Sequence, residues 1–218
     1  MKAATNFAGF AWFNELDGRW TVPARPTTYH SQIDYLFTGL QNSSSTAWIL
    51  QPVLGYGPVP GGGGGNYWVT QVWYATTTGN DFHTAASKVN PGDLLRTYMH
   101  VTDCTAAGSC TWQVSIFRDV GATHAFPSYI SIRPPSIANW ALKGVLEAYN
   151  ITACSDLPSD GSVTFSKVFL GMPQGTGSLL VFPSGTSLST TNVLRNVTSP
   201  SCGYAASAPT ADSAKLIY

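Results

Sequence analysis

The sequence predicts an all-β protein in which a single domain forms a bent antiparallel sandwich of two sheets. The readable segments are short and rich in Trp, Tyr, Phe, Val and Thr, and Gly, Pro, Asn and Asp separate them, which is the strand-and-turn pattern of a sandwich. No segment shows a sustained 3.6-residue period, so we expect at most one or two short helical turns. The length of 218 residues suits one domain.

Ten segments combine aromatic or β-branched residues with flanking turn residues, and we expect each to be a strand. In chain order they are Phe7 to Phe13, Trp20 to Val22, Ser31 to Gly39, Trp48 to Tyr56, Tyr67 to Tyr74, Leu94 to Thr102, Thr111 to Asp119, Gly144 to Tyr149, Ser162 to Leu170 and Leu179 to Phe182.

Two segments are expected to lie outside this strand framework. The run Gly61 to Gly65 is too flexible to order itself and is predicted to be a mobile hairpin tip. Residues 171–218 are poor in charge and rich in Gly, Ser, Thr and Pro. We expect this stretch to wrap around the domain as a C-terminal extension rather than to form a second domain.

The strand from Tyr67 to Tyr74 carries large aromatic side chains on both faces. Alternation puts Tyr67, Val69, Gln71 and Trp73 on one face and Trp68, Thr70, Val72 and Tyr74 on the other. Such a strand is either buried on both faces or uses one face as a binding platform. The sequence leaves both alternatives open.

Charge and hydropathy exclude two classes of partner. Eleven Lys and Arg balance eleven Asp and Glu, so there is no basic field to hold nucleic acid or anionic lipid. No apolar stretch approaches the roughly 20 residues that a membrane helix needs. We therefore expect a monomer that binds neither nucleic acid nor membrane.

The cysteines indicate disulfides rather than a metal site. None of the four forms a close CxxC pair with a downstream His, so we expect no zinc and no other metal. Cys104 and Cys110 bracket a short turn and are predicted to pair, which leaves Cys154 with Cys202 by elimination.

Three N-glycosylation sequons begin at Asn42, Asn150 and Asn196. Each alone is weak evidence, because a chain rich in Ser and Thr produces sequons by chance. Together with the cysteines and the low charge they favour a secreted glycoprotein. No hydrophobic signal core follows Met1 in this sequence, so we expect any secretion signal to have been removed.

Two polar residues interrupt apolar strands. Neither a GxSxG elbow nor an HExxH motif occurs. Glu147, however, shares a strand face with Val145 and Tyr149, and Gln51 lies in the apolar run from Trp48 to Leu54. A carboxylate or amide in such a strand is costly unless it has partners, and functional sites are enriched in these groups. The alternatives are a structural Gln–Glu hydrogen bond or two outward-facing side chains.

Six blocks of the sequence resemble, in order, the glutamic peptidases known as eqolisins. The blocks are Phe7 to Phe10, Gly18 to Pro23, Phe37 to Leu40 with Ile49 to Gln51, Tyr67 to Tyr74, Asn90 to Asp93, and Val145 to Glu147 with Gly161 to Phe165. The resemblance implies a concanavalin A-like jelly roll, in which a bent two-sheet sandwich holds a catalytic dyad on its concave face. Gln51 and Glu147 match the dyad.

The chain also departs from the family pattern. The family carries a Trp three residues before its glutamate, where this chain has Gly144. A register set on Trp140 instead would put Lys143 in the glutamate's place and abolish the dyad. We prefer Glu147, because its distance to the block at residues 162–165 then fits almost without gaps. Val72 replaces a frequent acid, and the stretch after Gly171 has no counterpart in the family.

The predicted function is that of a secreted, acid-acting endopeptidase without a cofactor, with a polypeptide as its substrate. Gln51 and Glu147 would be catalytic, and four aromatic residues, Trp20, Trp68, Trp73 and Tyr74, would contact the substrate. The alternative is a carbohydrate-binding module or a polysaccharide-active enzyme on the same sandwich, with aromatic side chains stacked on sugar rings. For a lyase, His100 or His124 with Arg96 or Arg118 are nominal candidates for the catalytic groups.

Overall fold

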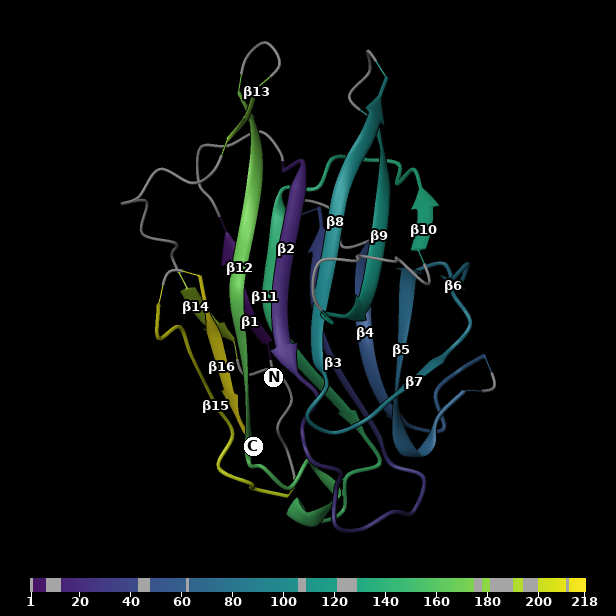
Figure 1. Ribbon diagram of the computed structural model, residues 1–218, viewed down its shortest axis with the longest axis vertical. Coiled ribbons are helices and arrows are strands. Elements are labelled where there is room, and N and C mark those ends of the chain that lie inside the picture. The colour runs from purple at the N-terminus through teal and green to yellow at the C-terminus, as the bar shows by residue number, and fades with distance from the viewer. Residues whose placement is uncertain are drawn as a thin grey trace.

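The computed structural model consists of two antiparallel sheets packed face to face (Figure 1). The described residues contain one short 3₁₀ turn, η1 (Cys154–Asp156), and no α-helix. The predicted all-β sandwich is confirmed. The structure describes residues 2–6, 13–42, 48–61, 63–105, 109–120, 129–174, 178–180, 190–193, 200–210 and 212–218, with the backbone alone for 2–6, 172–174, 178–180 and 190–193.

The outer face of the first sheet carries the candidate functional site described below. Its strand order is β14 (Thr190–Val193), β1 (Lys2–Asn6), β11 (Trp140–Tyr149), β3 (Ile33–Gln41), β4 (Trp48–Gly57), β5 (Gly65–Thr76) and β6 (Phe82–His83), and β7 (Ser87–Val89) also pairs with β5. β3, β4 and β5 therefore form a three-stranded meander that lies beside β11. The middle of β11 comes about 90 residues after the middle of this meander.

The second sheet covers one face of the first. Its strand order is β10 (Tyr129–Ile132), β9 (Cys110–Arg118), β8 (Leu94–Cys104), β2 (Glu15–Thr21), β12 (Ser162–Gln174), β16 (Ala214–Ile217) and β15 (Ala205–Ser207), and β13 (Ser178–Leu180) pairs with β12. The C-terminal residues thus add strands to the edge of this sheet beside β12.

The main core lies between the two sheets, and four tryptophans fill much of it. Trp20, Trp48, Trp68 and Trp112 are each at most 1% exposed. Aromatic side chains of this size bury large apolar areas, which makes them a major source of stabilisation.

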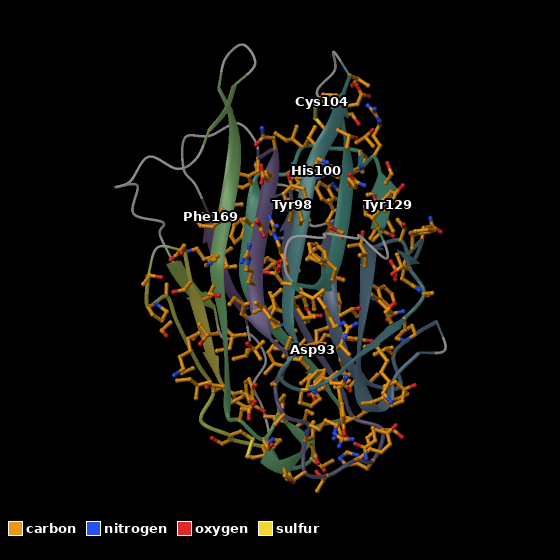
Figure 2. The ribbon with its side chains drawn as sticks, viewed as in Figure 1. Asp93, Tyr98, His100, Cys104, Tyr129 and Phe169 are labelled. Atoms are coloured by element: carbon orange, nitrogen blue, oxygen red, sulfur yellow. A yellow bond between two sulfur atoms is a disulfide. The ribbon has the colours of Figure 1, made fainter. Side chains whose placement is uncertain are left out.

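The outer face of the first sheet carries a second, smaller apolar cluster. Phe37, Val53, Leu142 and Val145 form it, and four further residues pack against it: Tyr35, Ile49, Trp73 and Trp140. The outer face of the second sheet is more polar (Figure 2). There Arg96 Nε donates to Asp17 Oδ1 at 3.0 Å, and the rings of Tyr98 and His100 lie 4.8 Å apart.

Most of the predicted strands are present, often with longer bounds than expected. β11 begins at Trp140 rather than at Gly144, and β2 begins at Glu15 rather than at Trp20. The predicted strand from Phe7 to Phe13 is not supported at Phe13, which lies outside any strand, and residues 7–12 lie outside the described residues. Residues 181 and 182 of the predicted strand from Leu179 to Phe182 also lie outside the described residues.

The strands that sequence analysis missed are mostly short edge strands. β6 and β7 have two and three residues, and β15 has three. A period of two residues cannot be recognised over so few positions. The predicted hairpin tip joins β4 to β5, with Gly62 outside the described residues.

Both predicted disulfides are confirmed. Cys104 is bonded to Cys110, and Cys154 is bonded to Cys202. The second bond ties η1 to the C-terminal segment that leads into β15. Two disulfides fit an extracellular protein.

Of the predicted sequons, Asn42 is 5% exposed and its side-chain amide donates to the Ile137 carbonyl at 2.8 Å. Asn150 is exposed in the turn after β11, and Asn196 lies outside the described residues. Among the described residues, no helix is long and apolar enough to cross a membrane.

Candidate functional site

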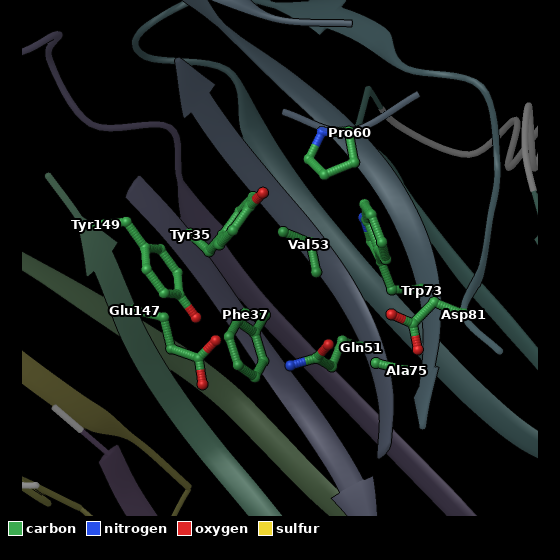
Figure 3. A pocket seen from close by; sticks show the side chains of 10 residues that line it. All are labelled: Tyr35, Phe37, Gln51, Val53, Pro60, Trp73, Ala75, Asp81, Glu147 and Tyr149. Carbon is green, nitrogen blue, oxygen red and sulfur yellow. The ribbon is translucent and has the colours of Figure 1, made fainter. Parts of the chain in front are cut away.

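A pocket of about 200 Å³ lies on the outer face of the first sheet (Figure 3). It forms where β11, β3, β4 and β5 run side by side, and the segments after β4 and β5 close its rim. The residues that line it are Tyr35, Phe37, Gln51, Val53, Pro60, Trp73, Ala75, Asp81, Glu147 and Tyr149. Both predicted catalytic residues are in this set.

Strand alternation explains why these side chains converge. On β4, Gln51 and Val53 face the pocket, whereas Leu50 and Leu54 point into the main core. The same alternation on β5 turns Trp73 towards the pocket and Val72 towards the core. The face of the Tyr67 to Tyr74 strand that sequence analysis left open is therefore a pocket wall at Trp73.

A β-bulge in β11 brings Glu147 to the pocket face. Leu142 pairs with Gly39 and Val145 pairs with Phe37, so β11 has one residue more than β3 between these two pairs. Leu142 and Val145, three residues apart, consequently lie in the same outer cluster. Strict alternation from Leu142 would instead have turned Glu147 towards the core.

The bulge contains Lys143 and Gly144. Lys143 is 1% exposed and does not line the pocket, and its burial lowers its pKa, an effect that the charge of Asp212 opposes. The register that would put Lys143 in the pocket in place of Glu147 is thus not the one observed.

Gln51 and Glu147 face the same pocket from opposite sides of β3. Figure 3 shows the Gln51 amide directed towards the Glu147 side of the pocket, with the ring of Phe37 between the two groups. Both side chains are half-buried. Each can therefore reach a bound molecule and remain in contact with solvent.

The two residues are also offset along β3. Glu147 pairs with Tyr35, and the pairing of Leu50 with Leu40 places Gln51 opposite Gly39. Positions 35 and 39 are separated by four residues, or about 13 Å of strand. The offset places the two residues at different points along the pocket, on either side of Phe37.

Two tyrosines surround the carboxylate of Glu147. Tyr149 hydrogen-bonds to Glu147, and burial, the charge of Glu147 and this bond raise the pKa of Tyr149. The ring of Tyr35 meets that of Tyr149 edge to face at 6.1 Å. Burial, followed by the charges of Tyr149 and Glu147, raises the pKa of Tyr35 to about 12. Both phenols are therefore protonated hydrogen-bond donors over the acid and neutral range.

Of the four residues predicted to contact the substrate, Trp73 lines the pocket and the other three do not. Trp20 and Trp68 are 1% and 0% exposed in the main core, where they pack against Phe165 and Tyr56. Side chains without exposed surface cannot contact a substrate. Tyr74 lies on the opposite face of β5 from Trp73, packed against the main core.

Sequence analysis missed several pocket residues. Tyr35, Phe37 and Val53 follow from alternation once the pocket face of each strand is known. Alternation places Tyr149 on the same strand face as Glu147, and this was the one signal in the sequence for Tyr149 as a pocket residue. Asp81 lies between β5 and β6, and no pattern in the sequence places it near Gln51.

The pocket offers an amide, two carboxylates and aromatic walls. Asp81 accepts a hydrogen bond from the backbone N–H of Thr76 at 2.7 Å, which fixes its carboxylate at the rim. Within the described part of the chain, no three His, Cys, Asp or Glu side chains gather in a way that could hold a metal ion. The chemistry available to these groups is proton transfer by a carboxyl group and hydrogen-bond donation by an amide.

Comparison with solved structures finds the same architecture in two peptidases. The crystal structure of scytalido-glutamic peptidase with a peptide-based transition-state analogue aligns with a TM-score of 0.58 and 14% sequence identity, over 100% of this chain and 97% of that chain. SCP-B, a member of the eqolisin family, in complex with the tripeptide Ala-Ile-His aligns with a TM-score of 0.56 and 14% identity, over 100% and 96% of the two chains.

At the level of sequence there is no such match. No family model matches the chain, and no curated protein matches it. The likeness is therefore one of fold, and it extends over the whole length of both chains. The protein has the β-sandwich fold of the glutamic peptidases.

Proposed function

We propose that the protein is a hydrolase that cleaves peptide bonds in the pocket formed by β11, β3, β4 and β5, as a divergent relative of the eqolisins. One observation carries the proposal: a carboxylate and a side-chain amide, from strands far apart in the sequence, face one pocket on the outer side of the first sheet. The fold shared with two peptidases supports it.

Amide hydrolysis needs a base to deprotonate water, a donor for the developing oxyanion and an acid for the leaving nitrogen. The Glu147 carboxylate accepts a proton from the attacking water and then, as a carboxylic acid, donates it to the departing nitrogen. The Gln51 amide donates a hydrogen bond to the carbonyl oxygen as negative charge develops there. No metal or cofactor takes part in this mechanism.

The separation of the two groups suits a substrate held between them. A hydrogen bond from water to the base and one from the amide to the carbonyl oxygen each span about 2.8 Å. The water and the scissile carbonyl occupy the space between. The offset of Gln51 and Glu147 along β3 provides such a space, with Phe37 as its floor.

Trp73 and the other aromatic walls would hold the substrate chain. We propose that substrate side chains pack against Trp73, Val53 and Tyr35, which together give the pocket an apolar side. We further propose that the protein acts outside the cell, where its two disulfides are stable, and, in keeping with its resemblance to the eqolisins, at acid pH.

The assay is cleavage of a denatured, reduced and alkylated protein between pH 2 and 7, with products identified by mass spectrometry. We expect cleavage on the acid side of this range. The matched control is Glu147→Gln, prepared in the same way, which excludes a contaminating protease. A wild-type protein that is inert towards every peptide tested would overturn the proposal.

A second candidate function is glycan binding or cleavage. The indole of Trp73 and the exposed ring of Tyr149 flank the polar groups of the pocket, as in sites that stack sugars on aromatic rings. The lyase candidates considered from sequence do not line this pocket where the structure describes them: His100 and Arg96 lie on β8 and Arg118 ends β9, both in the second sheet. His124 lies outside the described residues. Binding of oligosaccharides measured by calorimetry, with the denatured protein left intact, would favour this alternative.

A further inference from the structure

The side chain of Tyr149 lies beside Glu147 in the pocket and is not part of the main core. Both residues lie on β11, two positions apart, so their side chains project from the same face of the strand. The side chain of Tyr149 is 52% exposed and lines the pocket, so it makes little contribution to the core. A side chain in this position can contact groups in the pocket as well as solvent.

The hydroxyl of Tyr149 meets the carboxylate of Glu147. The two groups are hydrogen-bonded, with the phenol as the donor. Figure 3 shows the Tyr149 ring lying along the strand with its oxygen next to the Glu147 carboxylate. An ionised carboxylate has two oxygens and accepts several hydrogen bonds. A donor fixed on one side leaves the rest of the group directed into the pocket.

Tyr35 fixes Tyr149 in turn. Its ring is held on β3 between β11 and β4, and it contacts the Tyr149 ring edge to face at 6.1 Å. Contacts of this geometry between aromatic rings are favourable beyond the area that they bury. The half-exposed Tyr149 ring therefore has one wall that restricts its rotation and holds its hydroxyl near Glu147.

Other ionisable groups near Glu147 come from several elements. Tyr35 faces it from β3, and Asp81 lies across the pocket at the far rim. Tyr149 differs from these groups because its hydroxyl comes from the same strand, so the distance between donor and carboxylate is set by β11 itself.

We propose that Tyr149 is a positioning residue that orients the Glu147 carboxylate towards the substrate through its hydrogen bond, and this rests on the function proposed above. The carboxylate acts first as a base and then as an acid, and both steps depend on its direction.

The test removes the hydroxyl and keeps the ring, with Tyr149→Phe. We expect kcat to fall about tenfold with KM changed less than about twofold, because one hydrogen bond to a charged group is lost and the pocket wall remains. Tyr129→Phe is the matched control, since Tyr129 is 54% exposed on β10 in the second sheet. It should leave both constants unchanged.

A second measurement does not depend on activity. The chain contains two glutamates, Glu15 and Glu147, so protein labelled with carbon-13 at the glutamate carboxyl gives two signals, which Glu147→Gln assigns. In Tyr149→Phe the chemical shift of the Glu147 carboxyl carbon, measured at one fixed pH, should change because a hydrogen bond to this group is lost, and the signal of Glu15 should not move.

An unchanged carboxyl chemical shift for Glu147 would overturn the role of Tyr149, as would a kcat within twofold of wild type. Tyr149→Leu, which removes ring and hydroxyl together, should raise KM as well as lower kcat. If wild type cleaves no peptide, the proposed function fails, whereas the chemical shift of Glu147 still decides whether Tyr149 holds the carboxylate.

Discussion

Gly144 lies against the ring of Phe165, and a β-carbon at position 144 would come within 2.5 Å of that ring. Gly144 is in the bulge of β11, three residues before Glu147, and Phe165 belongs to β12 in the opposite sheet. The absence of a side chain at this position lets the bulge and the aromatic core coexist. The bulge in turn determines which face of the sheet carries Glu147.

Gly144→Ala should therefore reduce both stability and activity. The added methyl group must displace either the Phe165 ring or the bulge, and overpacking of this kind costs about 1–3 kcal/mol of unfolding free energy. Denaturant unfolding measures the loss. The double variant Gly144→Ala with Phe165→Leu provides room for the methyl group and should recover part of the activity. Full activity in Gly144→Ala alone would show that the bulge tolerates a side chain.

Glu147→Gln and Gln51→Ala should each abolish most of the hydrolysis and leave the fold intact. Replacement of the carboxyl group removes proton transfer, which contributes about 10²- to 10⁴-fold, and loss of the amide donor costs about a hundredfold or more. Both side chains are half-buried at the pocket, so melting temperatures should stay close to wild type. Undiminished activity in Glu147→Gln would exclude its role as base and acid.

Variants of Trp68 and Trp73 should distinguish a structural role from a substrate-binding role. Trp68→Ala should destabilise the protein by about 3–5 kcal/mol, because its fully buried side chain leaves a large cavity in the main core. Trp73→Ala should mainly raise KM, since this side chain lines the pocket. Urea unfolding and steady-state kinetics on the same two variants make the comparison. Equal losses of stability in both would contradict the assignment of their faces.

Asp34 should make the protein more stable in acid than at neutral pH. Asp34 is 0% exposed, and neither of its carboxyl oxygens has a hydrogen-bond partner among the residues that the structure describes. Burial, with a smaller effect from the charge of Asp156, raises its pKa from 3.8 to about 8. Between these two values the folded state keeps a proton that the unfolded state releases. Stability is thus fully present below about pH 4 and declines as pH rises to about 8.

The decline attributable to Asp34 can reach about 1.4 kcal/mol of unfolding free energy per pH unit. Unfolding free energies measured from pH 4 to 8 test this, with Asp34→Asn as the matched variant, because the amide has nearly the same shape and does not ionise. The slope should be smaller in Asp34→Asn. Identical slopes in both proteins would mean that Asp34 does not govern this dependence.

The fold could be predicted largely because strand patterns survive in single sequences. The segments from Trp48 to Tyr56 and from Leu94 to Thr102 have enough alternating positions to define a strand and both of its faces. Both disulfides followed from the short turn between Cys104 and Cys110, because that pairing left one other choice. Edge strands such as β6 and β7 carry no comparable signal.

The site was harder to predict, for two physical reasons. The depth of an aromatic residue depends on which face the second sheet covers, so Trp20 and Trp68 looked like binding residues although they belong to the core. The position of Asp81 depends on the path of the turn between β5 and β6. Glu147 was recognised as unusual, but the bulge that turns it outwards cannot be read from alternation, because a bulge breaks that very pattern.

Because side chains alternate along these strands, positions that face the main core and positions that face the pocket can be changed separately. On β3, Leu36 and Leu40 belong to the core while Tyr35 and Phe37 face the pocket. A library of variants confined to pocket-facing positions such as Tyr35, Phe37 and Val53 would therefore leave the interface between the sheets intact. Because Phe37 and Val53 are 0% and 4% exposed in the outer apolar cluster, such variants would test the packing of that cluster without disturbing the main core.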